Sequence, residues 1–151
     1  MADQTTQTII IDAPPARCFD IVLDVERYPE WAPDIKSVEV RGRETDGRAG
    51  LVAYRAAAMG RSTSYVLRYY YGTNPLRVSW RLEEGDVVSR MDGDYILAHA
   101  PGDPASTEVT YHLSVDMRVP LPSFVKRRAE ARIVRTALLE LKTRAELSVA
   151  G

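Results

Sequence analysis

Tyrosine is the side chain whose number and spacing in this sequence most suggest a chemical role. The chain has eight tyrosines and only two phenylalanines. A tyrosine in a packed core needs a partner for its hydroxyl, because an unpaired buried polar group costs about 1–3 kcal/mol. A tyrosine that faces a partly hydrated pocket needs no such partner. The excess of tyrosine therefore predicts an apolar cavity that can also hold water or the oxygen atoms of a ligand.

The residues predicted to line this cavity come mainly from the apolar faces of alternating segments, with a few from helical segments. They are Trp31, Tyr54, Tyr65, Tyr69, Trp80, Met91, Tyr95, Leu113, Val115, Phe124 and Arg128. The alternative for several of the tyrosines is the outer face of an exposed sheet, where tyrosine is also favoured.

Two arginines near the end of the chain, Arg128 and Arg132, flank an apolar helical stripe. Arginine binds carboxylates and phosphates well, so either residue is a candidate anchor for a charged group on a ligand. The alternative is an ordinary solvated helix face within the run KRRAEAR. The same basic run leaves open a third reading, in which the chain is an interaction module that docks on nucleic acid or a ribosome. The net charge of −1 gives that reading little support.

The histidines give little support to acid–base catalysis. An enzyme on this scaffold would need an acid and a base close to its substrate. His112 has the opposite strand parity to Leu113, and His99 lies at the end of a predicted strand. We therefore predict no catalytic residue from this pattern.

A glycine offers the best remaining route to catalysis. Asp92 and Arg90 point away from the predicted cavity if their strand is regular. A bulge at Gly93 would reverse that parity and turn one of them inward.

Metal sites, cofactor loops and disulfides are not indicated. Two distant histidines and the single Cys18 do not form a metal-binding pattern, and no glycine-rich phosphate loop is present, so we expect no metal and no cofactor. One cysteine and no export-signal pattern predict a cytoplasmic protein. The near-neutral charge gives no reason to expect nucleic acid as a partner. No run approaches the roughly 20 apolar residues of a membrane span.

The elements that must position these side chains follow from hydrophobic periodicity and turn residues. Period-two runs predict strands, and apolar residues three and four apart predict helices. The turn signals between the strands include TDG, MG, GTNP, EEGD and APGDP. The predicted order is a strand at 6–12, a helix at 14–26, a short helix at 29–33, six strands at 35–42, 50–60, 61–72, 75–86, 87–101 and 106–120, and a helix at 121–147. Because the links between the strands are short, the strands are expected to be antiparallel.

The last helix sets the shape of the domain. About 25 helical residues reach roughly 37 Å, while one helix about 10 Å wide cannot cover seven strands spaced about 4.8 Å apart in a flat sheet. The sheet must therefore bend around the helix, and the two short helices must close the space that remains. On this argument Tyr28 and Trp31 lie at the mouth of the cavity.

The pattern resembles the START-like (SRPBCC, helix-grip) superfamily, and within it the polyketide cyclase/dehydrase and lipid transport group, which is similar to the coenzyme Q-binding proteins. The segments that carry the resemblance are IDAPPARCFDIVLDVERYPEWAPDIKSVEV, VSWRLEEG, MDGDYIL and VPLPSFVKRRAEARIVRTALLELKTRAE. The resemblance implies an α+β helix-grip fold in which a curved seven-stranded antiparallel sheet surrounds a long C-terminal helix. It covers nearly the whole chain, so we expect a single START-like domain over residues 1–151.

The resemblance also implies the kind of function. Members of such families bind or transform hydrophobic molecules, so we expect binding or carriage of a lipid, quinone or polyketide in an internal cavity. The alternative is an aromatic polyketide cyclase/dehydratase. The ligand, the presence of catalysis and the oligomeric state stay open.

Overall fold

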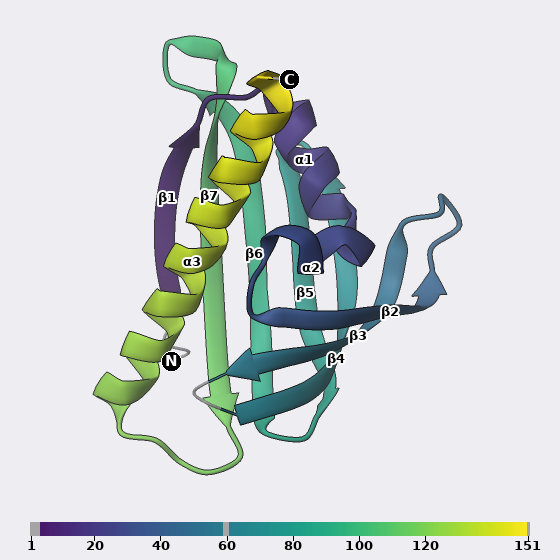
Figure 1. Cartoon of the computed structure of the whole chain (residues 1–151), viewed down its shortest axis with the longest axis vertical. Helices are drawn as coiled ribbons and strands as arrows, with labels where there is room; N and C mark the ends of the chain where they lie inside the picture. The colour runs from purple at the N-terminus through teal and green to yellow at the C-terminus, as the bar shows by residue number, and fades with distance from the viewer. Residues whose placement is uncertain (1–3, 59–60, 151) are drawn as a thin grey trace.

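A curved antiparallel sheet and a long helix make up most of the computed structural model, which describes residues 4–58 and 61–150 (Figure 1). The chain runs through β1 (Thr5–Ile11), α1 (Pro15–Leu23), the 3-10 turn η1 (Val25–Arg27), α2 (Tyr28–Trp31), β2 (Ile35–Arg43), β3 (Ala49–Ala58), β4 (Arg61–Thr73), β5 (Leu76–Gly85), β6 (Val88–Ala100), β7 (Asp103–Met117) and α3 (Ser123–Ala150). The predicted order of elements is confirmed. The turn expected at Met59–Gly60 lies outside the described residues. The helix predicted over 14–26 ends earlier, at Leu23, and η1 follows it.

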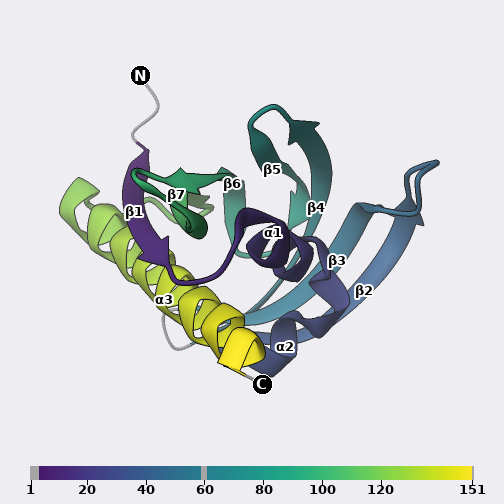
Figure 2. The same cartoon turned by 90° about the horizontal axis from the view of Figure 1, so that it is seen from above.

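The seven described strands form one sheet in the order β1-β7-β6-β5-β4-β3-β2. Every neighbouring pair is antiparallel, as the short connections require. β1 returns to the far edge and pairs with β7, with Thr5 opposite Leu113. Seen from above, the strands curve round from β1 to β2, and the helices lie on the concave side (Figure 2). The predicted helix-grip α+β fold is therefore confirmed.

The C-terminal helix lies along β1 and β7 and reaches α1 and α2 at its other end (Figures 1 and 2). Its residues Val134, Leu138, Leu141 and Ala145 are almost completely buried. They recur three and four residues apart, so they form one apolar stripe on the helix. This stripe packs α3 onto one side of the sheet and leaves the other side of the concave surface for the short helices.

A tyrosine joins the two short helices. The Tyr28 hydroxyl donates a hydrogen bond to the Val22 carbonyl oxygen at 2.5 Å. Val22 and Cys18 of α1 are fully buried in the core. The contact fixes α2 against the end of α1, so the segment that borders the cavity is tied to the core.

One buried carboxylate, Glu130, was not singled out in the sequence. Its side chain is 1% exposed, and it accepts hydrogen bonds from the Val115 N–H at 2.6 Å and from the Thr5 hydroxyl at 3.0 Å. The Lys126 ammonium lies 3.0 Å away, one helical turn earlier. Glu130 thus satisfies a backbone donor of β7 near the point where β1 begins, and it links α3 to both strands.

Candidate functional site

A cavity of about 580 Å³ lies between the concave face of the sheet, the α2 region and α3. Its walls come from segments that are far apart in the sequence. The lining side chains are Tyr28, Trp31, Ala32, Pro33, Asp34, Ile35, Tyr54, Ala56, Ala57, Thr63, Tyr65, Leu67, Tyr69, Trp80, Met91, Tyr95, Tyr111, Leu113, Val125, Arg128, Ala129, Arg132, Ile133, Thr136 and Ala137. Most of them are apolar or aromatic, which is typical of sites for small organic molecules.

α3 contributes one wall through a second stripe, separate from the one that packs on β1 and β7. Val125, Ala129, Ile133 and Ala137 are spaced four residues apart and border the cavity. The two alanines are short, so the helix approaches the sheet without filling the space between them. The same helix therefore both seals the core and leaves a hollow beside it.

Nine of the eleven residues predicted to line a cavity border this one. They are Trp31, Tyr54, Tyr65, Tyr69, Trp80, Met91, Tyr95, Leu113 and Arg128. They come together because Tyr54 and Tyr65 are paired across β3 and β4, and Tyr69 and Trp80 are paired across β4 and β5. Residues directly opposite each other in a sheet lie on the same face.

The other two predicted residues are placed elsewhere. Phe124 is 65% exposed in the first turn of α3. Its neighbour Val125 borders the cavity, and successive helical residues point about 100° apart, so Phe124 faces away. Val115 is buried, but it lies further along β7, where its backbone binds Glu130. The placement of Phe124 and Val115 in the cavity was therefore wrong.

Tyr28 and Tyr111 complete the aromatic wall. Tyr111 was not predicted to border the cavity, and Tyr28 was predicted at its mouth. The alternation of Tyr111 with Leu113 on one strand face was a usable signal for Tyr111. The sequence placed Tyr28 at the mouth and not on the inner wall, because the orientation of a short helix is set by tertiary contacts.

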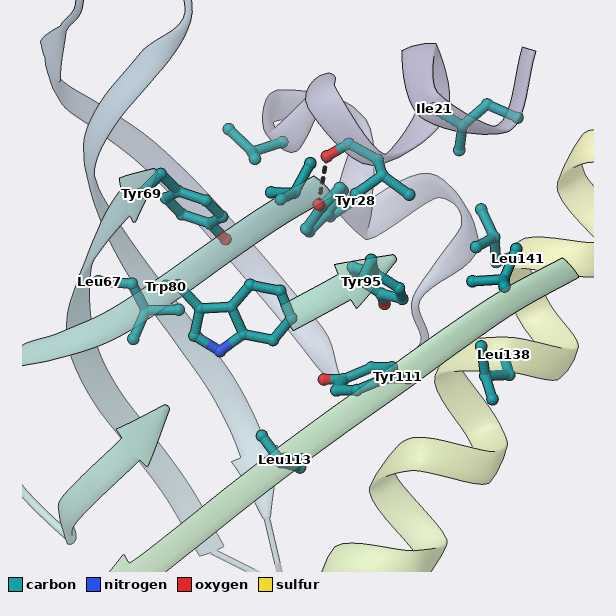
Figure 3. Close-up of a cluster of buried hydrophobic side chains, with 14 of the residues drawn as sticks. Ile21, Tyr28, Leu67, Tyr69, Trp80, Tyr95, Tyr111, Leu113, Leu138 and Leu141 are labelled. Atoms are coloured by element: carbon teal, nitrogen blue, oxygen red, sulfur yellow. Dashed lines mark hydrogen bonds between the residues drawn. The ribbon is translucent and has the colours of Figure 1, made fainter. Parts of the chain in front are cut away.

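The aromatic rings of the wall form two groups of rings in contact, and Figure 3 shows part of one group, Tyr69, Trp80, Tyr95 and Tyr111. Ring centroids are 5.5 Å apart for Tyr54 and Tyr65, 6.0 Å for Tyr69 and Trp80, and 5.5 Å for Trp80 and Tyr95. Tyr95 and Tyr111 are closest, at 4.4 Å. Such contacts between rings hold the wall in a defined shape.

Some polar atoms of this wall are paired within the protein, and others are not. The hydroxyls of Tyr54 and Tyr69 hydrogen-bond to each other. The Tyr65 hydroxyl and the Trp80 indole N–H have no hydrogen-bond partner among the described residues. Both belong to side chains that border the cavity, so they are available to a ligand oxygen.

Burial keeps the tyrosine hydroxyls protonated. It raises the pKa of Tyr65 and of Tyr95 above the ordinary value, and the nearby Asp34 carboxylate raises the pKa of Tyr65 further. At neutral pH these hydroxyls are therefore neutral groups that donate hydrogen bonds, and they are poor general bases.

The exposed members of the lining mark the mouth of the cavity. They are Pro33 and Asp34 in the connection from α2 to β2, and Arg128 and Arg132 on α3. Tyr28 and Trp31, which we expected at the mouth, are 9% and 7% exposed and form the inner wall instead. The opening lies next to them, where Pro33 and Asp34 of the lining are exposed.

A second, smaller pocket of about 250 Å³ also borders Trp31. It is lined by three arginines and two aspartates, together with Ile21 and Trp31. Arg27 pairs with Asp24 at 3.1 Å, and Arg144 pairs with Glu30 at 2.8 Å. This charged lining does not suit a hydrophobic molecule, so the larger cavity is the candidate site.

The bulge considered at Gly93 is not present. Pairing between β6 and β7 is regular from Arg90 to His99, and Gly93 lies opposite Leu113. Asp92 remains outside the cavity, where it pairs with Arg90 at 3.1 Å and accepts the Leu82 N–H at 3.3 Å. The hypothesis that a bulge brings Asp92 or Arg90 inward was therefore wrong. Gly93 instead leaves space for the indole ring of Trp80, which packs against it.

Both histidines lie away from the cavity. His112 Nδ1 is 2.8 Å from the Thr6 hydroxyl, and its Nε2 is 3.9 Å from the Asp94 carboxylate. His99 Nδ1 is 3.0 Å from the Pro104 carbonyl oxygen. Within residues 4–58 and 61–150, no three or more His, Cys, Asp or Glu side chains gather in a way that could hold a metal. None of the helices in the described part is long and apolar enough to cross a membrane.

Comparisons with solved structures identify similar folds. A START superfamily protein from Mycobacterium smegmatis is 24% identical, with a TM-score of 0.88 over 95% of this chain and 97% of that chain. The Zhui aromatase/cyclase from Streptomyces sp. R1128 is 16% identical, with a TM-score of 0.85 over 99% and 96% of the two chains. TTHA0849 from Thermus thermophilus is 21% identical, with a TM-score of 0.79 over 97% and 99%. At these identities the likeness shows the fold.

Sequence comparison gives the family. No match was found among curated proteins. A family model described as polyketide cyclase / dehydrase and lipid transport matches residues 11–142, which is most of the chain. The expected similarity to coenzyme Q-binding proteins in particular stays a prediction. Because this match covers residues 11–142, the chain belongs to the polyketide cyclase/dehydrase and lipid transport family.

Proposed function

We propose that this protein binds a hydrophobic small molecule, such as a lipid, quinone or polyketide, non-covalently in its internal cavity. The observation that carries the proposal is the cavity itself, which has about 580 Å³ of space and mainly apolar and aromatic walls. Ligand pockets in proteins have volumes of roughly 300–1,000 Å³, so a modest organic molecule fits.

The binding energy would come from desolvation, with polar groups setting the orientation. Each Å² of apolar surface removed from water contributes roughly 25 cal/mol. The unpaired Tyr65 hydroxyl and Trp80 N–H would donate hydrogen bonds to an oxygen of the ligand. If a ligand had no oxygen at that position, these two donors would bind water or stay without a partner.

The second candidate is cyclisation or dehydration of a polyketide chain. The observation that favours it is the position of Asp34, a carboxylate on the cavity lining whose charge acts on the Tyr65 hydroxyl. Tyr65 would polarise a substrate carbonyl as a hydrogen-bond donor, and Asp34 would accept a proton. The walls would fold a flexible chain and exclude water, and proximity would supply part of the rate. The Zhui aromatase/cyclase has a similar fold.

Native mass spectrometry of the purified protein tests the binding proposal. We expect an additional mass that dissociates intact and is identified as a hydrophobic compound. An Ala129→Trp variant, which places a large ring in the cavity, should lose this mass. A Leu139→Trp variant should keep it, because Leu139 is 46% exposed on the same helix and does not border the cavity. Equal binding by both variants would contradict the cavity as the site.

A turnover assay separates the two candidates. A carrier should return an added polyketide surrogate unchanged. An enzyme should convert it, and an Asp34→Asn variant should slow the conversion while leaving binding in place. If the protein converts the surrogate and Asp34→Asn slows this reaction, the function is catalysis and not carriage.

A further inference from the structure

Two arginines at the cavity mouth have no partner among the described residues. Arg128 and Arg132 lie one helical turn apart on α3, and both side chains border the cavity and are exposed. No hydrogen bond or ion pair reaches either guanidinium from the described part of the chain. By contrast, Lys126 on the same helix pairs with Asp116 at 3.5 Å and Glu130 at 3.0 Å.

The charges that face the cavity do not cancel. Its lining holds two guanidiniums, Arg128 and Arg132, and one carboxylate, Asp34, among the described side chains. The tyrosines of the wall add no negative charge at neutral pH. Burial raises the pKa of buried wall tyrosines such as Tyr65 and Tyr95, so their hydroxyls keep their protons. The lining therefore carries a net charge of one positive unit, and this charge lies at the mouth, where all three charged side chains are exposed.

The positions of the charges give a direction to the bound molecule. The deep wall, formed by Trp80, Tyr95 and Leu113, is uncharged and buried, while the charges gather at the opening. An amphiphile would place its apolar part inside and its charged end at the rim. Arginine suits this position because its planar fork donates two parallel hydrogen bonds to a carboxylate.

We infer that the ligand is an amphiphilic carboxylate whose anionic end is bound by Arg128 and Arg132 at the mouth of the cavity. The inference rests on the proposed binding function and narrows its ligand class. A monoanion matches the single net positive charge of the lining. A fully apolar molecule would leave the guanidiniums unused, and a phosphate dianion would exceed the net charge.

Matched probes test this inference. The protein, freed of any co-purified ligand, is titrated in a calorimeter with dodecanoic acid, dodecanol and dodecyl phosphate at concentrations too low for micelles. We expect dodecanoic acid to bind about 10-fold or more tightly than dodecanol, because hydrogen bonds to charged groups are the stronger ones. Raising the salt concentration should reduce this preference, since the arginines are exposed.

Variants locate the preference. In an Arg128→Gln/Arg132→Gln double variant the affinity for dodecanoic acid should fall about 10-fold or more, while that for dodecanol stays within about 2-fold. Arg135→Gln is the matched control, because Arg135 is exposed on the same helix and does not border the cavity. Unchanged dodecanol binding also shows that the double variant is folded.

Each outcome bears on a different claim. Equal affinity of the wild type for the acid and the alcohol would overturn this inference and leave the proposed function standing. Tighter binding of dodecyl phosphate than of the acid would overturn the choice of a carboxylate. Failure of all three probes to bind would overturn the inference, while the proposed function is tested separately by native mass spectrometry. If Arg135→Gln lowered the affinity for dodecanoic acid as much as the double variant does, the effect would come from overall charge. That result would overturn Arg128 and Arg132 as the binding site.

Discussion

The indole ring of Trp80 on β5 packs directly onto Gly93 of the neighbouring strand β6. The two residues are paired in the sheet, and a Cβ atom at position 93 would lie 2.8 Å from Cζ2 of the indole and 2.6 Å from the His112 carbonyl oxygen. No side chain fits in that space. Gly93 therefore determines how far the Trp80 ring extends into the cavity.

Gly93→Ala should destabilise the protein and alter the cavity. The added methyl group must displace either the indole or the backbone of β7, and such overpacking costs about 1–3 kcal/mol. Urea denaturation measures the free energy of unfolding, and tryptophan fluorescence reports the movement of the ring. Gly72→Ala is the control, because its Cβ would meet nothing closer than 3.5 Å. Equal stability of the two variants would show that Trp80 does not depend on Gly93.

Tyr54→Phe should destabilise the fold by about 1 kcal/mol, since it removes the hydrogen bond between the Tyr54 and Tyr69 hydroxyls. Tyr69→Phe should cost a similar amount. The double variant should lose less unfolding free energy than the two single variants lose together, because the two hydroxyls bind each other. A double-mutant cycle from urea denaturation measures this coupling, and strictly additive losses would contradict the hydrogen bond.

Stability should fall steeply above about pH 10. Burial raises the pKa of Tyr65 and Tyr95, while tyrosines in the unfolded chain ionise near pH 10. Below that pH both states keep the protons, so there is no effect. Above it only the unfolded state releases them, and each such tyrosine lowers the free energy of unfolding by about 1.4 kcal/mol per pH unit.

Urea denaturation at a series of alkaline pH values checks this slope. Tyr65→Phe should make the fall less steep. A free energy of unfolding that stays constant to about pH 11 would mean that the hydroxyls are not buried in the folded state.

Glu130→Ala should destabilise the protein by about 2 kcal/mol or more. The substitution leaves the Val115 N–H and the Thr5 hydroxyl without their acceptor. Glu140→Ala on the same helix is the control, because its side chain is only partly buried. Urea denaturation compares the two variants, and a loss at Glu130 no larger than at Glu140 would rule out the bridging role.

Tyr65→Phe should weaken binding of ligands that carry a carbonyl group without weakening the fold. The hydroxyl has no partner among the described residues, so its removal breaks no internal hydrogen bond. For a naphthoquinone we expect the affinity to fall about 3- to 10-fold, and for naphthalene to stay unchanged. Quenching of tryptophan fluorescence measures both. An equal effect on the two probes would show that Tyr65 acts through shape alone.

Most of the fold could be predicted from the sequence, because its signals are local. The alternation along β7 and the three-and-four spacing along α3 each reflect the geometry of one element. The mutual placement of Tyr54, Tyr65, Tyr69 and Trp80 also followed, since residues on one face of consecutive antiparallel strands must meet. Phe124 was misplaced because one helical residue changes direction by about 100°, and the apolar stripes did not show which turn of α3 meets the cavity.

Gly93 shows where local reasoning stops. A glycine within a strand indicates either a bulge or a close approach by another group, and the sequence alone does not distinguish them. Only the position of the Trp80 ring, which comes from another strand, decides in favour of close approach.

The sequence by itself determined the order of the elements, the antiparallel sheet, the bend around the last helix and most of the aromatic wall, because periodicity and short connections act within or between adjacent segments. The tertiary structure alone decided the volume of the cavity, the position of its mouth at Pro33, Asp34, Arg128 and Arg132, and the pairing of Glu130 with β7. These features depend on how side chains from distant segments fill shared space, and no single segment carries that information.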